Sequence, residues 1–238
     1  MSQKSLLAVG IISFAVFAAG CNKQPQPEVT PEPAAEEAML PDTSMMDVAT
    51  LEGMHYQVDV AASFVQWSAQ KAVVDTKHTG TVEISEGEIV LTPEKTGFVG
   101  ARFVMDMTTI IDEDLTGKMK ETLETHLKSD DFFSVATHPT ATLVVTEAAL
   151  NADGSYTMTG DLTIKGITHQ VTFPATVALD GEELTASAEL TIDRAKWDVR
   201  FGSDNFFEDL GDNLIDDQVR FEIEITAAPA TDPLELIN

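Results

Sequence analysis

Hydrophobic and polar residues alternate along most of the chain after about residue 54. Near the start of this region, polar residues separate Tyr56, Val58 and Val60. Because successive side chains of a strand point to opposite faces, a period of two predicts a strand with one buried face. The pattern recurs at 65–67, 82–84, 89–91, 103–107, 143–145, 156–158, 171–179, 184–192 and 219–225. So many short strands predict an all-β fold, either a sandwich or a barrel.

Turn residues separate several of these segments. Glu86 and Gly87 predict a turn between 82–84 and 89–91, and residues 151–154 predict another. Gly166 lies between two apolar segments and predicts a tight hairpin in which this glycine has a positive φ. Short turns of this kind join antiparallel neighbours, so the sheet is expected to be antiparallel.

One segment, residues 112–128, breaks the period of two. Its apolar residues recur at every fourth position, at Leu115, Met119, Leu123 and Leu127. That spacing predicts one amphipathic helix inserted into the β fold, with Thr109 or Asp112 in its N-cap region. Such a helix can lie across the mouth of a barrel, and its stripe can serve either as core or as a ligand surface.

The first 20 residues have the pattern of a secretory signal. Lys4 is followed by an apolar run at 6–17, which has the length of a signal core and is too short to span a bilayer. Ala18, Ala19 and Gly20 then precede Cys21, the only cysteine, and this resembles the lipobox of bacterial lipoproteins, although Ala18 stands where leucine is usual. We expect Cys21 to be lipidated and to anchor the protein to a membrane; the alternative is an ordinary signal with a chance cysteine.

Residues 21–53 are rich in Pro and Glu and lack apolar periodicity. This composition predicts a disordered tether that holds the folded part away from the membrane. The expected organisation is therefore a signal peptide at 1–20, a tether at 21–53, a barrel domain at 54–228 and a tail at 229–238. Asn22 after the cysteine favours the outer membrane, and the expected location is the bacterial cell envelope.

The charge narrows the possible partners. The chain has 40 acidic and 14 basic residues, a formal net charge of −26. Nucleic-acid binding needs lysine and arginine contacts to phosphate, so nucleic acid is excluded as an expected partner, and anionic lipid headgroups offer no attraction. A solvated acidic surface is the simplest interpretation, and the chain can be a monomer or a homo-oligomer.

Signatures of catalysis are missing from the sequence. It contains no G-x-S-x-G, H-E-x-x-H or Walker motif. The five histidines, His55, His78, His126, His138 and His169, are scattered, so a zinc site would have to be assembled from distant strands. We therefore expect no enzyme, no cofactor and no metal site.

The interior is expected to be bulky and apolar, because the chain has 12 Phe, 9 Met and 2 Trp. A barrel of about eight strands can be filled by such side chains or can hold one ligand. The residues themselves leave both alternatives open.

Three segments resemble the characteristic blocks of the YceI-like family. They are HLKSDDFFSVATHPTATLVV (126–145), GDLTIKGITHQVTFPATV (160–177) and ASAELTIDRAKWDVRFGS (186–203). The stretch from Tyr56 also resembles the opening strand of the family, so the resemblance covers about 54–227. Asp198 and Val199 depart from the family pattern, which commonly has Gly and an aliphatic residue there.

The resemblance implies a lipocalin-like antiparallel β-barrel of about eight strands, secreted or periplasmic, and some members of the family hold a polyisoprenoid in a tunnel. The expected function is that of a membrane-anchored protein that sequesters or transports an apolar long-chain ligand, such as a polyisoprenoid. Two alternatives are a scaffold or interaction domain with a filled barrel, and a hydrolase that uses carboxylates or His126.

Candidate ligand-binding residues are bulky side chains that we expect to point into the barrel, either from their place in the strand alternation or from their place in the segments that resemble the family. They are Trp67, Phe103, Met105, Phe132, Phe133, Leu143, Tyr156, Met158, Phe173, Trp197 and Phe221. Phe132 and Phe133 are adjacent, so a regular strand cannot bury both rings on one side. We expect a corner there, fixed by His126 and Ser129, with one or both rings directed inward. His126 and Arg194 are two further candidate ligand-binding residues. Arg194 has inward parity and needs either a carboxylate partner or the polar head of a ligand.

Overall fold

The computed structural model describes residues 47–73 and 76–230. The expected signal peptide at 1–20, Cys21, the tether as far as residue 46 and the tail from residue 231 lie outside the described residues. Within the described part, no helix combines the length and the apolar character needed to cross a membrane.

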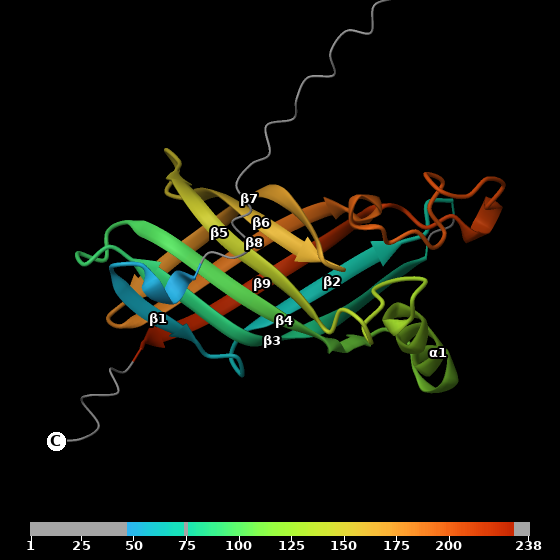
Figure 1. Cartoon of the computed structure of the whole chain (residues 1–238), viewed down its shortest axis with the longest axis horizontal. Helices are drawn as coiled ribbons and strands as arrows, with labels where there is room; N and C mark the ends of the chain where they lie inside the picture. Colours follow the sequence, from blue (N-terminus) through green and yellow to red (C-terminus); the bar gives the residue numbers. More distant parts are fainter. Residues whose placement is uncertain (1–46, 74–75, 231–238) are drawn as a thin grey trace, which may run out of the picture. The chain divides into compact units, whose positions relative to one another are not determined.

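Nine strands and one α-helix make up this part of the chain (Figure 1). In chain order they are β1 (Met54–Val58), β2 (Phe64–Gln70), β3 (Lys77–Leu91), β4 (Phe98–Asp112), α1 (Gly117–Lys128), β5 (Thr140–Leu150), β6 (Tyr156–Ile164), β7 (Ile167–Asp180), β8 (Glu183–Asp193) and β9 (Gln218–Pro229). Three 3-10 helices complete the list: η2 (Val48–Thr50), η3 (Arg194–Trp197) and η4 (Gly211–Asn213).

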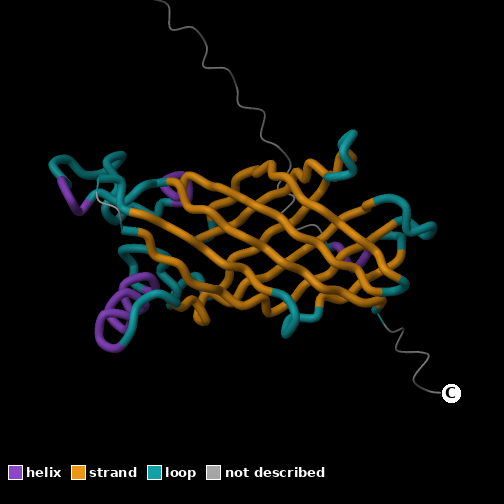
Figure 2. Tube along the Cα trace, turned by 180° about the vertical axis from the view of Figure 1, so that it is seen from behind, coloured by secondary structure: helices purple, strands orange, loops and turns teal. Residues whose placement is uncertain are grey.

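The sheet closes into a barrel with eight strand positions. Its order is β1-β3-β2-β9-β8-β7-β6-β5-β4, and β4 also pairs with β3 to complete the ring. Both β1 and β2 lie between β3 and β9: β1 pairs with the C-terminal part of β3 and β2 with its N-terminal part. All pairings are antiparallel, and the strands cross as a closed lattice in Figure 2. The predicted antiparallel barrel of about eight strands with one helix is confirmed.

The turn predicted at Glu86 and Gly87 is wrong. Strand β3 continues through both residues, with register shifts against β4 between Thr81 and Glu83 and between Ile84 and Glu86. Gly87 lies where the neighbour of β3 changes from β2 to β1, and a Cβ atom built on it would be 2.5 Å from Cγ2 of Val58. The glycine therefore permits close packing inside a long bulged strand and does not mark a chain reversal.

Helix α1 begins later than predicted. Asp112 is the last residue of β4, Thr109 lies within β4, and Thr116 is the N-cap residue. Only the C-terminal end of the predicted stripe is buried: Leu127 is 7% exposed, whereas Met119 is 67% exposed. The helix lies at one end of the barrel (Figure 1) and inserts mainly its last turn into the core.

Gly166 has φ +73° and Lys165 φ +52° in the two-residue hairpin between β6 and β7, which confirms the tight turn.

The tether was predicted to extend to residue 53, but Val48 in η2 is only 1% exposed. The folded part therefore begins before residue 54, because an apolar side chain preceding β1 packs against the barrel.

Candidate ligand-binding site

An apolar cavity of about 280 Å³ lies inside the barrel. Strands β2 to β9 and the last turn of α1 all contribute side chains to its wall. The volume is close to the lower end of the range of roughly 300–1,000 Å³ that is typical of small-molecule sites. The barrel is therefore hollow enough to accept a ligand.

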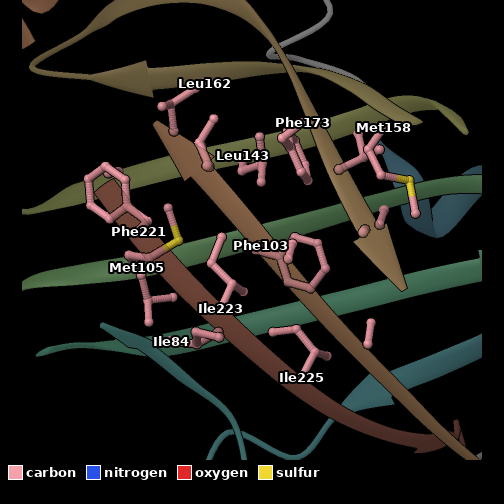
Figure 3. Close-up of a pocket in the computed structure, with 18 of the residues that line it drawn as sticks. Ile84, Phe103, Met105, Leu143, Met158, Leu162, Phe173, Phe221, Ile223 and Ile225 are labelled. Atoms are coloured by element: carbon pink, nitrogen blue, oxygen red, sulfur yellow. The ribbon is translucent and has the colours of Figure 1, made fainter. Parts of the chain in front are cut away.

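The central part of the cavity is surrounded by hydrocarbon and thioether groups. In Figure 3, side chains from facing strands converge on the same space, among them Phe103, Met105, Met158, Phe173 and Phe221. Because these side chains offer no strong hydrogen-bonding group, a molecule between them would be held by removal of apolar surface from water.

Small side chains in the wall leave part of the barrel interior unfilled. Six alanines line the cavity between the bulky groups: Ala69, Ala101, Ala141, Ala175, Ala186 and Ala188. A barrel of eight strands is narrow enough to be filled completely by large inward residues, so alanine at these positions leaves unfilled volume. Ala186 and Ala188 have the same parity on β8, which opens one side of the interior.

One end of the cavity is lined by the loop between β3 and β4. Lys95, Thr96 and Gly97 of this loop contribute to the wall. Thr92 stabilises the loop, because its Oγ1 accepts hydrogen bonds from the N–H groups of Thr96 (3.3 Å) and Gly97 (3.1 Å). The Nζ of Lys95 lies 5.9 Å from the centroid of the Tyr56 ring. This end therefore adds a cation and a hydroxyl to a wall that is mostly apolar.

The Phe132–Phe133 pair lines the cavity near the opposite end of the barrel. The two residues lie in the turn after α1, and their ring centroids are 6.4 Å apart. Ser129 organises the corner: its carbonyl accepts hydrogen bonds from the N–H groups of Phe132 and Ser134, and its hydroxyl donates to the carbonyl of His126. Both rings face the cavity because the chain between them is a turn, in which strand alternation does not apply.

His126 supports this corner from outside the cavity wall. Its ring centroid is 5.1 Å from that of Phe132 and 4.3 Å from that of Phe201, and its Nε2 lies 3.2 Å from Oδ2 of Asp131. His126 is absent from the set of cavity-lining residues. Its contacts are those of a residue that positions Phe132.

Arg194 reaches the cavity wall, but the protein itself satisfies its guanidinium group. Nη2 forms a 2.9 Å ion pair with Oδ1 of Asp217, the carboxylate partner that was one of the two alternatives. Four hydrogen bonds, at 2.9–3.2 Å, go to the carbonyls of Val199, Phe201, Ile215 and Asp216. The guanidinium group is therefore held by a carboxylate and four carbonyls of the protein, which favours a structural role over binding of a ligand head. Burial lowers the pKa of Arg194, but arginine remains protonated throughout the physiological range.

Trp197 also lies outside the cavity wall. It is 2% exposed, and its indole N–H donates to the carbonyl of Leu162 at 3.0 Å. The ring meets His169 edge to face, with centroids 5.0 Å apart. Trp197 therefore belongs to the packed core around η3 and does not line the cavity.

Eleven of the thirteen predicted ligand-binding residues line the cavity: Trp67, Phe103, Met105, Phe132, Phe133, Leu143, Tyr156, Met158, Phe173, Arg194 and Phe221. Lys95, the alanines and many aliphatic residues of the wall were not predicted from the sequence. Ile223 and Ile225 share the parity of Phe221 on β9, so extending the alternation would have found them. Among the wall residues of the described chain there is no Asp, Glu, His or Cys, and the wall thus offers no carboxylate–histidine pair.

Comparison with known proteins gives a family match over most of the barrel. The profile of the YceI-like domain matches residues 56–227. A "UPF0312 protein" of Pseudomonas aeruginosa is 43% identical over 58 residues, and one of Shewanella denitrificans is 40% identical over 58 residues. Each of these alignments covers 24% of this chain and only 30% of the relative.

Two solved structures resemble the barrel over most of its length. BcnA of Burkholderia cenocepacia is 29% identical, with a TM-score of 0.57 over 73% of this chain and 99% of that chain. A polyisoprenoid-binding domain of Saccharophagus degradans, implicated in plant cell wall breakdown, is 14% identical, with a TM-score of 0.52 over 74% of this chain and 99% of that chain. At 14% identity the second likeness concerns the fold alone.

Proposed function

The chain belongs to the YceI-like domain family, and from this premise we propose that it binds a long apolar chain inside its barrel. The observation that carries the proposal is the apolar cavity, with its wall drawn from β2 to β9. A filled barrel would have no such space, so the cavity favours the binding module over the scaffold alternative.

The proposed ligand class is a polyisoprenoid or a similar hydrocarbon chain. Phe, Met, Leu and Ile side chains surround the centre of the cavity. Burial of a hydrocarbon chain among them would contribute about 0.8 kcal/mol of binding free energy per CH₂ group. The thioethers of Met105 and Met158 adapt readily to methyl branches. The description of the Saccharophagus degradans domain as polyisoprenoid-binding supports the same class.

We place the polar head of this ligand at the loop between β3 and β4. Lys95 and Thr96 are the polar groups of the wall at that end, whereas Arg194 near the other end is already held by Asp217 and by four carbonyls of the protein. A chain with one weakly polar or anionic end would therefore enter with its hydrocarbon directed toward Phe132 and Phe133.

The proposal includes a membrane anchor at Cys21 and a role in carrying or sequestering lipid in the bacterial cell envelope. Its support is the resemblance of the sequence around Cys21 to a lipobox, together with the Pro- and Glu-rich segment that follows. Such a tether would let the barrel reach the membrane surface while its acidic exterior stays in water.

Native mass spectrometry of the purified full chain, followed by solvent extraction, tests the ligand. The expected result is one copurifying apolar molecule per chain. Phe103→Asp places a charge in the cavity wall and should abolish this lipid, whereas Glu83→Lys on the outer face of β3 should retain it. Equal lipid content in the two variants, both folded by circular dichroism, would refute the proposal.

A further inference from the structure

A cluster of three ligand-type side chains lies at the end of the barrel where β3 begins and β4 ends. His78 is the second residue of β3, Asp112 is the last residue of β4, and Asp114 follows in the segment that leads to α1. None of the three belongs to the cavity wall. The fold thus brings together groups that are scattered in the sequence, where no metal site was expected.

The distances within the cluster fit a single ion. Nδ1 of His78 lies 2.9 Å from Oδ2 of Asp114 and 3.7 Å from Oδ2 of Asp112, and one ligand atom from each residue falls within 4.8 Å of the others. In a tetrahedral site with bonds of about 2.0–2.1 Å, donor atoms are about 3.3 Å apart. The separations of 2.9 Å and 3.7 Å lie on either side of that value.

Asp112 gives a second, independent indication of a missing partner. Its side chain is 0% exposed, and its Oδ1 accepts a hydrogen bond from the N–H of Leu115 at 2.7 Å. Its Oδ2, directed toward His78, has no hydrogen-bond partner. A buried carboxylate oxygen without a hydrogen-bond partner is costly. A cation between Asp112, His78 and Asp114 would supply the interaction that the protein leaves out.

We propose that His78, Asp112 and Asp114 bind one divalent transition-metal ion, with Zn²⁺ as the preferred class. His78 would coordinate through Nδ1 as a neutral ring with its proton on Nε2, and each aspartate would contribute Oδ2. One imidazole with two carboxylates suits Zn²⁺, whereas Ca²⁺ takes six to eight oxygen ligands. A water molecule would complete the fourth position.

Backbone groups already orient both carboxylates. Oδ1 of Asp114 accepts a hydrogen bond from the N–H of Thr79 at 2.8 Å, as Oδ1 of Asp112 does from Leu115. Outer contacts of this kind fix ligand orientation in metal sites. Because the three ligands come from β3, β4 and the segment before α1, the ion would hold this end of the barrel to the start of the helix.

Zinc binding to the full chain, after chelation and removal of bound metal, tests the site. We expect one high-affinity Zn²⁺ per chain by calorimetry and elemental analysis, together with a rise in the thermal unfolding midpoint. Asp112→Asn keeps the side-chain size and should lower the zinc affinity at least about tenfold. Without metal, this variant should unfold at the same temperature as the parent chain or higher, because it removes a buried charge.

His55→Gln is the matched control. His55 also contacts a carboxylate, Glu88, at 2.6 Å, but it belongs to no three-residue cluster among the described residues. This variant should retain the site, which separates specific binding from diffuse attraction to a chain of net charge −26. The proposal is overturned if the parent chain binds no stoichiometric zinc, if Asp112→Asn binds it equally well, or if His55→Gln loses it as well.

Discussion

Alanine side chains in the barrel wall leave part of the space that a ligand would occupy. Ala188 lines the cavity from β8, whereas Ala178 lies on β7 with its side chain exposed. Alanine has the smallest side chain that still directs a Cβ atom inward, so its effect is to leave room for a guest. Bulky residues supply apolar character to the wall, but the small ones supply the space.

Ala188→Leu should therefore reduce lipid binding without introducing any polar group. The added carbons occupy cavity volume, so the amount of copurifying lipid should fall severalfold while stability changes by less than about 2 kcal/mol, since the space is already hollow. Solvent extraction and denaturant unfolding measure the two effects. Ala178→Leu adds the same atoms outside the barrel and should leave the lipid content unchanged; a parallel loss in both variants would contradict this account.

Arg194 acts at the residue scale as a structural cross-link. Its ion pair with Asp217 is almost fully buried, and it also binds four carbonyls around η3 and the segment before β9. Arg194→Met should lower the free energy of unfolding by roughly 3–5 kcal/mol, because Asp217 and the carbonyls lose their partner. Urea unfolding measures this loss.

Arg220 provides the comparison for that loss. It also pairs with carboxylates, Glu189 at 2.8 Å and Glu222 at 3.2 Å, but its side chain is 48% exposed. Arg220→Met should change the free energy of unfolding by at most about 1 kcal/mol, as is usual for exposed ion pairs. Similar decreases in the free energy of unfolding for Arg194→Met and Arg220→Met would contradict the role of Arg194 as a structural cross-link.

At the scale of the element, β3 shows how a long strand can serve two neighbours. It pairs with β2 in its first part and with β1 in its last, and Gly87 lies at the change of partner. Gly87→Ala should destabilise the fold by roughly 1–3 kcal/mol, because the new methyl group would overlap Val58. Adding Val58→Ala should recover part of this loss, and a double-mutant cycle in urea would measure the coupling. If the effects of the two substitutions on the free energy of unfolding are additive, overlap with Val58 is not the cause of the destabilisation.

Strand periodicity made most of the barrel predictable from the sequence. Alternation around Phe103, Phe173 and Phe221 identified β4, β7 and β9 together with their inward faces, because a half-buried strand imposes a period of two on its residues. The bulged course of β3 was not predictable in this way. Glycine marks turns and close approaches alike, and the tertiary contact with Val58 decides between them.

The proposed metal cluster and the exact lining of the cavity could not be predicted from the sequence, because both depend on contacts between distant segments. His78 and Asp112 are 34 positions apart, and only the register of β3 against β4, in which Gly80 faces Asp112, brings them together. Trp197 and Phe173 are both buried aromatic residues, yet only Phe173 reaches the cavity. Parity gives the face of a strand, but it does not show whether a residue after the strand end folds into the wall.

At the scale of the whole molecule, the excess of negative charge should make stability depend on salt. With 40 acidic and 14 basic residues, the compact state concentrates like charges that the unfolded chain can separate. Exposed ion pairs, such as Arg102 with Glu86, each neutralise one carboxylate, whereas the chain has a formal net charge of −26. Added salt screens the repulsion, since the Debye length falls from about 30 Å at 0.01 M to about 8 Å at 0.15 M.

Raising NaCl from about 0.01 M to about 0.15 M should therefore raise the thermal unfolding midpoint by roughly 2–4 °C, the shift that about 1 kcal/mol produces in a domain of this size. Differential scanning fluorimetry at constant pH measures it. An osmotically matched sucrose series separates screening from solvent exclusion, because sucrose changes no Debye length. If the midpoint falls as NaCl is added, attractive ion pairs contribute more to stability than the net repulsion removes. The effect of the acidic residues on stability would then come from their individual ion pairs.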